Sequence, residues 1–347
     1  MLRSTAPTLL LVTPYLAHAN NGNWRTAARW ARLLASRYQV IVQAATDPVT
    51  GDRRDDAVAM IALHARRSAP AIAAWHAARA ERALIVTLTG TDLYRDLPQG
   101  DAATLASLEV ADRLIVLQQD AVRHLPRAHR GKVSVVFQSS RTLAPWTGKA
   151  RKQLHCALVA HLREEKDPRT ALEAWRHLPP DLMASLTVIG DALDSALERA
   201  TRETVAADPR VRWIGKQPHA ATRQAIKRAH LLLVPSRMEG GANVVVEAVT
   251  ASTPVLASRI SGNLGMLGAD YTGYFDVGDA TALAQLVTRA AREPTFLRKL
   301  AMQCRRRAKL FTPAAEARSL HAAIDAAVNA GGTRMSDSRP TQNPQFS

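Results

Sequence analysis

Short hydrophobic runs alternate with segments of helical period along most of this chain. That alternation is typical of parallel α/β folds, in which strands are buried on both faces and helices connect them. In the first half the pattern predicts strands near residues 8–13, 39–44, 58–63, 84–88, 113–117 and 132–137. In the second half it predicts strands near residues 154–160, 185–190, 210–214, 231–234, 254–257 and 273–276. We therefore expect two Rossmann-like halves, which bind ligands at the carboxyl ends of their strands.

The segments between the strands define the expected domain organisation. The first helix is predicted to begin with Asn23 as its N-cap, and the likeliest linker is the Pro- and Gly-containing segment 141–152. Residues 1–145 would form an N-terminal Rossmann-like domain and residues 146–310 a C-terminal Rossmann-like domain. A helix over residues 311–330 would pack back toward the N-terminal domain. The Gly, Ser, Pro, Gln and Asn content of residues 331–347 predicts a disordered tail.

Composition and charge narrow the class of protein. The chain has 347 residues, enough for two domains, and its 47% hydrophobic content predicts a folded protein. The net charge of +16 is spread over both halves of the chain. Residues 1–148 contain 18 Lys and Arg and 11 Asp and Glu, and residues 149–347 contain 28 Lys and Arg and 19 Asp and Glu. No basic arm interleaves with aromatic residues, so we expect small anionic ligands rather than nucleic acid.

Other features concern the compartment. Only Cys156 and Cys304 are present, without metal-ligand spacing, which predicts reduced, buried thiols. The apolar stretch of residues 9–12 is too short for a signal peptide or a membrane span, so we expect a cytoplasmic protein without stable membrane insertion. The basic run of residues 298–309 has helical spacing. It is either a solvated face or a surface that touches an anionic membrane.

The segment around Glu239 and Glu247 carries the most chemistry. An apolar strand over residues 231–234 is followed by a Gly-containing loop that opens a helix near Asn243. Backbone N–H groups and the positive end of such a helix bind anions, typically phosphates. With one carboxylate in the loop and the other one turn into the helix, the segment suits a diphosphate with a sugar on each side. The alternative is a strand–turn–helix with two solvated glutamates.

The two glutamates, seven residues between them, resemble the donor motif of family-4-type glycosyltransferases with the GT-B fold. Residues 158–166 resemble the phosphate-clamp loop of that family, and residues 253–256 and 273–275 fit its remaining landmarks in order. The similarity covers roughly residues 8–328. It implies an α/β, GT-B protein in which two Rossmann-like domains face a central cleft.

The resemblance implies a role for each matching residue of the donor site. Glu247 would accept hydrogen bonds from the nucleotide ribose, and Glu239 would contact the transferred sugar. Lys166 matches the clamp lysine, and the second positive charge comes from either His161 or Arg163, with Arg163 favoured. The implied diphosphate-binding loop and the interdomain position comprise Gly240, Gly241, Ala242, Asn243 and Gln138.

Two loops of the first half are candidates for the acceptor. One is a polar loop followed by an arginine, which either binds a tetrahedral anion or only forms the turn that caps a helix. Its residues are Asn20, Asn21, Gly22, Asn23 and Arg25. The other contains Thr91 and Asp92. Asp92 would orient a sugar or an anion-binding arginine such as Arg95, or it would only cap the following turn.

These loops are similar to one branch of the family, the selenosugar synthases of bacterial selenoneine biosynthesis. That resemblance implies UDP-N-acetylglucosamine or UDP-glucose as donor, selenophosphate as nucleophile, and a 1-selenosugar, UDP and phosphate as products. Thr89 stands where many relatives carry a histidine, which suits an anionic selenium that needs no general base. No Asp-x-Asp pair occurs, so we expect metal-independent catalysis and no cofactor besides the UDP-sugar co-substrate.

Two other functions stay open. The first is a family-4-type glycosyltransferase that acts on a lipid, envelope or small-molecule hydroxyl acceptor. The second is a catalytically silent GT-B-like protein that binds a sugar nucleotide or nucleic acid. Retention of both glutamates and Lys166 favours an active donor site over the second. Isolated histidines such as His64 are more often packed or exposed than catalytic, and the sequence does not predict the oligomeric state.

Overall fold

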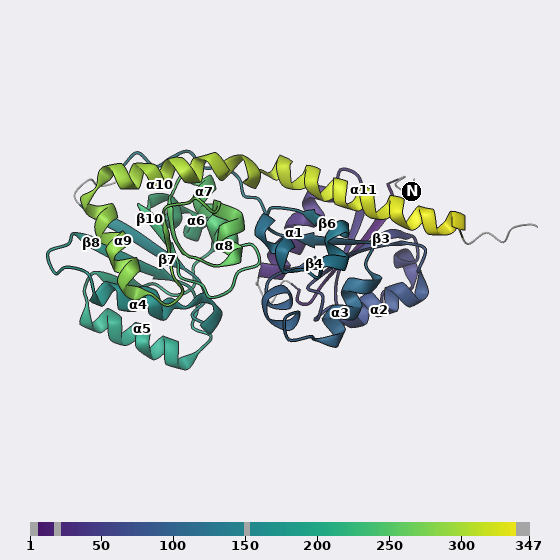
Figure 1. The fold of residues 1–347 in the computed structure, drawn as a ribbon, viewed down its shortest axis with the longest axis horizontal. Helices are drawn as coiled ribbons and strands as arrows, with labels where there is room; N and C mark the ends of the chain where they lie inside the picture. The colour runs from purple at the N-terminus through teal and green to yellow at the C-terminus, as the bar shows by residue number, and fades with distance from the viewer. Residues whose placement is uncertain (1–5, 17–21, 149–152, 338–347) are drawn as a thin grey trace, which may run out of the picture. The chain divides into compact units, whose positions relative to one another are not determined.

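The computed structural model describes residues 6–16, 22–148 and 153–337, with side chains up to residue 330. The chain divides into two compact units (Figure 1). Unit 1 comprises Met1–Leu117, Val122–Val136 and Ala317–Ser347, and unit 2 comprises Gln118–Ala121 and Phe137–Glu316. Apart from the short segment Gln118–Ala121, unit 2 begins at Phe137, whereas the sequence predicts a boundary at residue 146.

Unit 1 contains a six-stranded parallel sheet in the order β2-β1-β3-β4-β5-β6. All six strands lie where the hydrophobic pattern predicts them: β1 Thr8–Thr13, β2 Gln39–Ala44, β3 Ala57–Leu63, β4 Ala83–Leu88, β5 Arg113–Val116 and β6 Val133–Val135. The connecting segments form the helices α1 Gly22–Leu34, α2 Ala69–Ala78 and α3 Ala102–Val110. Shorter helical turns are η2 Asp52–Arg54, η3 Asp92–Asp96, η4 Gln119–His124 and η5 Arg127–Lys132.

Helix α1 covers the sheet of unit 1 with an apolar face. Ala27, Trp30 and Leu34 are fully buried against strand residues of the same hydrophobic cluster. The prediction that Asn23 is the N-cap of this helix is wrong. The helix begins at Gly22, and Asn23 lies inside its first turn. Residues 17–21, where a capping side chain would stand, lie outside the described residues.

The last helix, α11 Pro313–Asp337, belongs to both units. Its first turn is anchored in unit 2, where Ser139 Oγ donates a 2.5 Å hydrogen bond to Glu316 Oε2. Its middle supplies fully buried side chains to the same cluster as α1, and Asp325 pairs with Arg37 at 2.7 Å. The side chains that it contributes to the cluster are Leu320, Ala323, Ile324 and Ala327.

Helix α11 continues past Gly331, where the composition predicts disorder. Residues 331–337 are helical, and the rest of the predicted tail lies outside the described residues. Glycine weakens a helix by only about 1 kcal/mol per residue, whereas proline stops it. After Pro313 the next proline is Pro340, so the pair Gly331-Gly332 alone does not end a helix that is already propagating.

Unit 2 contains a second six-stranded parallel sheet in the order β12-β11-β10-β7-β8-β9. Its strands also match the predicted ones: β7 Leu154–Val159, β8 Ala184–Ile189, β9 Val211–Trp213, β10 Leu231–Val234, β11 Val255–Ser258 and β12 Tyr274–Phe275. Its helices are α4 Pro168–Arg176, α5 Ser195–Ala207, α6 His219–Arg228, α7 Asn243–Thr250, α8 Ser261–Leu267, α9 Ala280–Arg292 and α10 Pro294–Arg307. Shorter turns are η6 Glu164–Lys166 and η7 Ala308–Phe311.

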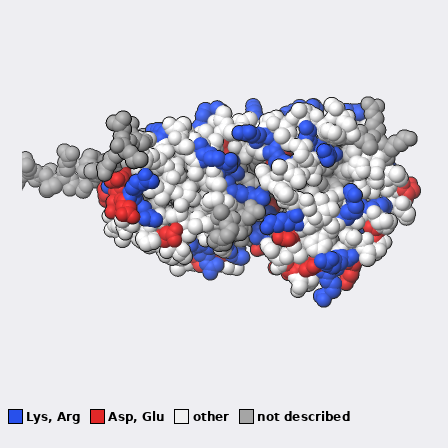
Figure 2. Space-filling model, turned by 180° about the vertical axis from the view of Figure 1, so that it is seen from behind, with Lys and Arg blue, Asp and Glu red and all other residues white. Residues whose placement is uncertain are grey.

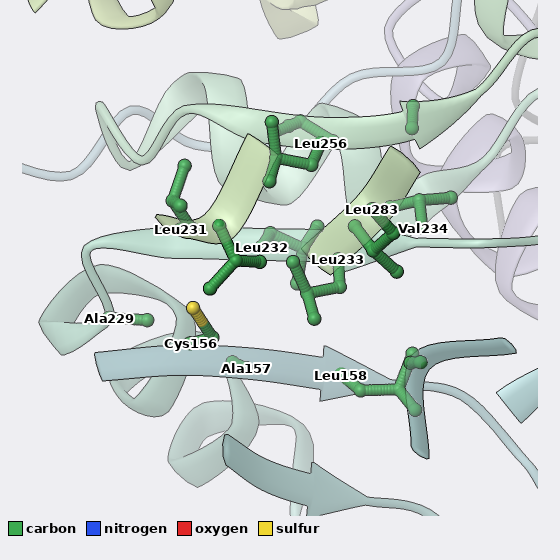
Figure 3. Close-up of a cluster of buried hydrophobic side chains, with 14 of the residues drawn as sticks. Cys156, Ala157, Leu158, Ala229, Leu231, Leu232, Leu233, Val234, Leu256 and Leu283 are labelled. Carbon is green, nitrogen blue, oxygen red and sulfur yellow. The ribbon is translucent and has the colours of Figure 1, made fainter. Parts of the chain in front are cut away.

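The core of unit 2 forms around the central strands β7, β10 and β11 (Figure 3). Residues 231–234 of β10 are all buried, as expected for a strand with both faces covered. Leu283 of α9 packs in the same cluster. Cys156 and Cys304 are both buried free thiols, as predicted, and burial raises the pKa of Cys304 to about 11.

The segment predicted as a linker is attached to unit 2 where the structure describes it. Leu143 N–H donates to Thr250 O at 2.9 Å, and Arg223 donates to Arg141 O at 2.8 Å. Residues 149–152 lie outside the described residues. The Pro and Gly content therefore marks a segment without helix or strand, but its described part is tied to unit 2 by these bonds.

Positive charge is distributed over the surface as the sequence indicates. In the face shown in Figure 2, Lys and Arg side chains occur on both units, with acidic side chains among them. Within the described part of the chain, no helix combines the length and the apolar character needed to cross a bilayer.

Candidate active site

Strand β10, the following loop and helix α7 form the strand–loop–helix unit that the sequence predicts. The strand ends at Val234 and the helix begins at Asn243. Ala242 occupies the N-cap and makes no side-chain cap bond. The positive end of α7 is therefore not neutralised by a capping side chain, which suits the binding of an anion.

Lys166 and Glu239 meet at the carboxyl ends of β7 and β10. Lys166 Nζ lies 2.6 Å from Glu239 Oε1, and Ser236 Oγ donates to the same oxygen at 2.7 Å. The Glu239 side chain is 7% exposed and that of Lys166 is 20% exposed. These groups line a small hollow together with residues 158–160, 233–235 and 244. Ser236 is a partner that the sequence pattern does not reveal.

One backbone bond and one ion pair connect the loop that carries Lys166 with the loop that carries Glu239. Arg237 N–H donates to Glu165 O at 2.9 Å, and the Arg237 guanidinium lies 3.2 Å from Asp167. Asp167 has a left-handed φ of 44° and caps α4, so Lys166 sits at a sharp turn between η6 and α4. The position of Lys166 is thus determined by both loops.

Gly262 lets helix α8 approach the Glu239 backbone. A Cβ atom on residue 262 would lie 2.0 Å from Glu239 O. Since real Cβ atoms do not approach a carbonyl oxygen so closely, any larger residue would displace the loop that carries Glu239. Without the fold, nothing in the sequence around Gly262 indicates this requirement.

Glu247 is buried on α7 and has two basic residues of α6, His219 and Arg223, as neighbours. Its Oε1 lies 2.8 Å from His219 Nε2. Burial lowers the pKa of the Arg223 guanidinium, and the charge of Glu247 opposes that shift. Sequence reasoning finds Glu247 but not these neighbours, since they come from a helix about 25 residues earlier.

The remaining donor-site candidates lie in the same unit. Arg163 is half exposed, and its Nε is 3.8 Å from Glu165 Oε2, whereas His161 is partly buried just after β7. Gln138 is buried. Gly240 and Ala242 are buried, and Gly241 and Asn243 are partly exposed around the start of α7. The geometry does not choose between His161 and Arg163 as the second cation.

The predicted acceptor residues fall into two groups. Asn20 and Asn21 lie outside the described residues, and Gly22, Asn23 and Arg25 form the first turn of α1. Thr91 is partly exposed just before η3, a short π-helical turn. Asp92 follows it and is fully buried.

The carboxylate of Asp92 binds several backbone N–H groups. Its oxygens accept backbone N–H groups from four residues, at 2.8–3.1 Å: Ala65, Thr89, Gly90 and Leu93. Three of these donors belong to the loops after β3 and β4 and only Leu93 belongs to the following turn, so the carboxylate holds the two loops together rather than only capping that turn. A direct contact with an acceptor would require one of these backbone bonds to be given up.

His64 lies beside Thr91 and Asp92, although the sequence marks it only as an isolated histidine. Its Nε2 is 2.9 Å from Thr91 Oγ1 and its Nδ1 is 3.6 Å from Asp92 Oδ2. Burial lowers the pKa of His64, against the opposing charge of Asp92, so the imidazole is neutral near pH 7. Its φ of 71° is uncommon for a residue other than glycine.

Within the described residues, no group of three or more His, Cys, Asp or Glu side chains is arranged to hold a metal ion.

Comparison with known proteins finds a family model that matches most of the second unit. The model of the family described as Glycosyl transferases group 1 matches residues 142–311. Glycosyltransferase 1 domain-containing protein 1 of Xenopus tropicalis is 27% identical over 152 residues, 43% of this chain and 43% of that protein. N-acetyl-alpha-D-glucosaminyl L-malate synthase of Bacillus anthracis is 22% identical over 148 residues, 42% of this chain and 38% of that protein. The chain thus matches less than half the length of these relatives.

Solved structures extend the likeness to both units. Anabaena HepE, solved in complex with UDP, superposes with a TM-score of 0.73 at 14% identity and covers 92% of this chain and 99% of its own. Sucrose-phosphate synthase from Thermosynechococcus elongatus gives a TM-score of 0.72 at 16% identity, covering 91% and 98%. At such identities the likeness concerns the fold. The chain has the GT-B fold, and its residues 142–311 match the glycosyl transferases group 1 family.

Proposed function

We propose that this protein is a glycosyltransferase that takes its sugar from a UDP-sugar. The observation that carries the proposal is the Lys166–Glu239 ion pair, beside a loop that leads into the uncapped start of α7. The family match over the same unit supports it, and so do neighbours solved with UDP, with UDP-glucose, and with UDP and GlcNAc. UDP-N-acetylglucosamine and UDP-glucose are therefore the donors to test first.

In the proposed donor site the two glutamates bind different parts of the UDP-sugar. Glu247 would accept hydrogen bonds from the ribose, and Glu239 would bind hydroxyls of the transferred sugar. The loop from Gly240 to Asn243 and the N-terminus of α7 would bind the diphosphate. Gln138 would lie near the transferred sugar, at the position where relatives carry an asparagine.

Lys166 would change partners when the donor binds. A diphosphate brings more negative charge than one carboxylate, so it would draw the ammonium away from Glu239. The released carboxylate would then accept hydrogen bonds from the sugar. The anomeric C1–O bond breaks with its electron pair going to the β-phosphate, and Lys166 with Arg163 or His161 would stabilise that charge without a metal ion.

For the acceptor we propose selenophosphate, on the resemblance of the loops at residues 19–30 and 89–96. A selenium lone pair would form the C1–Se bond as UDP leaves. Water would then cleave the Se–P bond and release phosphate and a 1-selenosugar. An anionic selenium needs no general base, in keeping with Thr89 where relatives carry histidine. Asn20, Asn21, Gly22, Asn23, Arg25 and Thr91 remain the proposed acceptor-binding residues, with Asp92 holding the loop that carries Thr91.

A second candidate is transfer to the hydroxyl of a small anionic acceptor. The observation in its favour is the likeness to the Bacillus anthracis protein, whose name specifies an L-malate product. In that reaction the acceptor hydroxyl must lose a proton, so a general base would be required. The two candidates share the donor and differ in the nucleophile.

The test is to incubate the full chain with UDP-N-acetylglucosamine or UDP-glucose and either selenophosphate or L-malate, and to analyse the products by mass spectrometry. A selenium-bearing sugar that requires both substrates supports the first candidate. A malate glycoside replaces it with the second. Failure to bind UDP or either donor contradicts the glycosyltransferase assignment itself.

A further inference from the structure

Three loops of unit 1 meet at the carboxyl ends of adjacent strands. Tyr15 follows β1, the segment from His64 to Arg67 follows β3, and Thr91 follows β4. Since β1, β3 and β4 are neighbours in the sheet and parallel strands lie about 4.8 Å apart, their side chains share one edge. Such an edge is where ligands of open α/β sheets bind.

Arg67 differs from the other arginines of this edge in its partners. Arg66 pairs with Asp96 at 3.4 Å and with Asp101 at 3.2 Å, and Arg95 pairs with Asp96 at 3.0 Å. Arg67 instead bonds to the Tyr15 hydroxyl, and its guanidinium carbon lies 5.3 Å from the centre of the Tyr15 ring. Among the described residues, no carboxylate lies within ion-pair distance of Arg67.

The Arg67 side chain is exposed, yet Tyr15 holds it in one orientation. Nη1 of the guanidinium bonds to the Tyr15 hydroxyl, and the N–H groups of Nε and Nη2 remain to donate two parallel hydrogen bonds. An oriented cation without a carboxylate partner is suited to a planar or tetrahedral oxyanion.

The tautomer of His64 determines what Thr91 offers. The backbone N–H of Arg67 donates to His64 Nδ1 at 3.4 Å, so that nitrogen acts as an acceptor. In the neutral ring Nε2 then carries the proton and donates to Thr91 Oγ1 at 2.9 Å. The hydroxyl proton of Thr91 is left to donate to a ligand. The same short segment after β3 thus supplies Arg67 and fixes the polarity of Thr91.

We infer that Arg67 and Thr91 form a subsite for a phosphate-class oxyanion, with Tyr15 and His64 as positioning residues. The inference rests on the proposed function, because it identifies this oxyanion with the phosphoryl group of the acceptor. It adds two elements that the acceptor loop of the sequence analysis lacks, a guanidinium and a hydroxyl aimed as a donor. A guanidinium together with a donating hydroxyl binds an anion, which is in keeping with an anionic nucleophile.

The test measures binding rather than turnover. Inorganic phosphate is titrated into the full chain and followed by ³¹P NMR line width, with UDP at saturation so that the donor's own phosphate site is filled. Arg67→Met should weaken phosphate binding about tenfold or more, the value of a lost charge-assisted contact. The matched control Arg53→Met removes an exposed arginine of the same unit and should leave phosphate binding unchanged.

Two further variant pairs test the positioning. Thr91→Ser should retain phosphate affinity, whereas Thr91→Val should lose several-fold. Tyr15→Phe keeps the stacked ring and should cost less than Tyr15→Ala. His64→Gln retains an N–H donor near Thr91, and its affinity should exceed that of His64→Leu at equal folded fraction, judged by melting temperature. The Thr91 and Arg67 variants decide the matter if the His64 variants do not fold.

The outcomes separate this inference from the proposed function. If Arg67→Met binds phosphate as Arg53→Met does, or if the wild-type protein binds none, the subsite is refuted while UDP binding still supports the donor site. Binding of L-malate that depends on Arg67, with phosphate binding independent of it, also refutes a phosphate-class site. Loss of UDP binding alone refutes the donor assignment and leaves the subsite standing.

Discussion

Glu239 of unit 2 and Asp92 of unit 1 are both buried carboxylates beside a strand end, but their partners differ in kind. Glu239 accepts from two side chains, Lys166 and Ser236. Asp92 accepts from backbone N–H groups of two loops. Side chains can rotate and be replaced by a ligand, whereas backbone groups cannot leave without unfolding their loop. A buried carboxylate is therefore available for chemistry only when its partners can be exchanged.

Removal of the Asp92 carboxylate should have the largest effect, and it should fall on stability. In Asp92→Ala several buried N–H groups lose their acceptor, each at about 1–3 kcal/mol, so we expect a loss of roughly 4 kcal/mol or more. The melting temperature measured by calorimetry should fall by about 8 °C or more. UDP binding by unit 2 is the control and should persist below the transition. A variant that melts with the wild type would remove the distinction between the two carboxylates.

Removal of the Lys166 ammonium should affect turnover more than stability. In Lys166→Met the leaving diphosphate loses a cation, and we expect kcat to fall by about 10²–10³-fold. Steady-state kinetics measures this, and Lys216→Met is the matched control, since Lys216 is an exposed lysine of the same unit. The melting temperature should fall by less than in Asp92→Ala, because Glu239 loses its cation but keeps its bond from Ser236. An unchanged kcat would show that the ion pair between Lys166 and Glu239 is structural and that Lys166 does not stabilise the leaving diphosphate.

Loss of the Glu247 carboxylate should weaken donor binding by roughly 10- to 100-fold. The reason is the loss of one or two charge-assisted hydrogen bonds to the ribose. Calorimetric titration with UDP checks this, with Glu198→Ala on α5 as control. If Glu247→Ala binds UDP with wild-type affinity, Glu247 serves only its neighbours His219 and Arg223.

Arg25→Ala should raise the KM for selenophosphate by about 3- to 10-fold, as expected for one partly exposed cation in the first turn of α1. Donor affinity should not change, because Arg25 belongs to unit 1. Initial rates at saturating donor measure the effect. A constant KM would leave the acceptor anion to other residues.

Addition of EDTA should have the smallest effect, with full activity retained. The positive groups proposed to stabilise the leaving diphosphate are Lys166, Arg163 or His161, and the N-terminus of α7. Activity assayed before and after chelation, then with magnesium restored, provides the measurement. Complete loss in EDTA that magnesium reverses would overturn this mechanism.

The sequence predicts the secondary structure far better than the contacts. In the part of the chain that the structure describes, the inner strands of both sheets are buried along hydrophobic runs that can be recognised locally, whereas the edge strands β2, β6 and β9 are only partly buried. Lys166 and Glu239, by contrast, are 73 residues apart, and only the order of β7 and β10 in the sheet brings them together. The partnership of His64 with Thr91 likewise depends on the pairing of β3 with β4.

Two features of the structure depend on physical effects that composition does not report. Composition around Gly331 predicts disorder, but a helix that is already formed extends at little cost per residue. The boundary of the units follows packing rather than Pro and Gly content, because Leu143 and Arg141 bond to unit 2. Local composition carries no information about such bonds.

The course of α11 has a consequence for how the chain is made. The sheet of unit 1 consists of residues before 136, but part of its cover consists of Leu320, Ala323, Ile324 and Ala327. During synthesis on the ribosome that side of the sheet stays incompletely covered until the entire second unit has emerged. The half that is translated first is therefore completed last, and a stop codon shortly before residue 320 should destabilise the N-terminal sheet while sparing the sheet of unit 2.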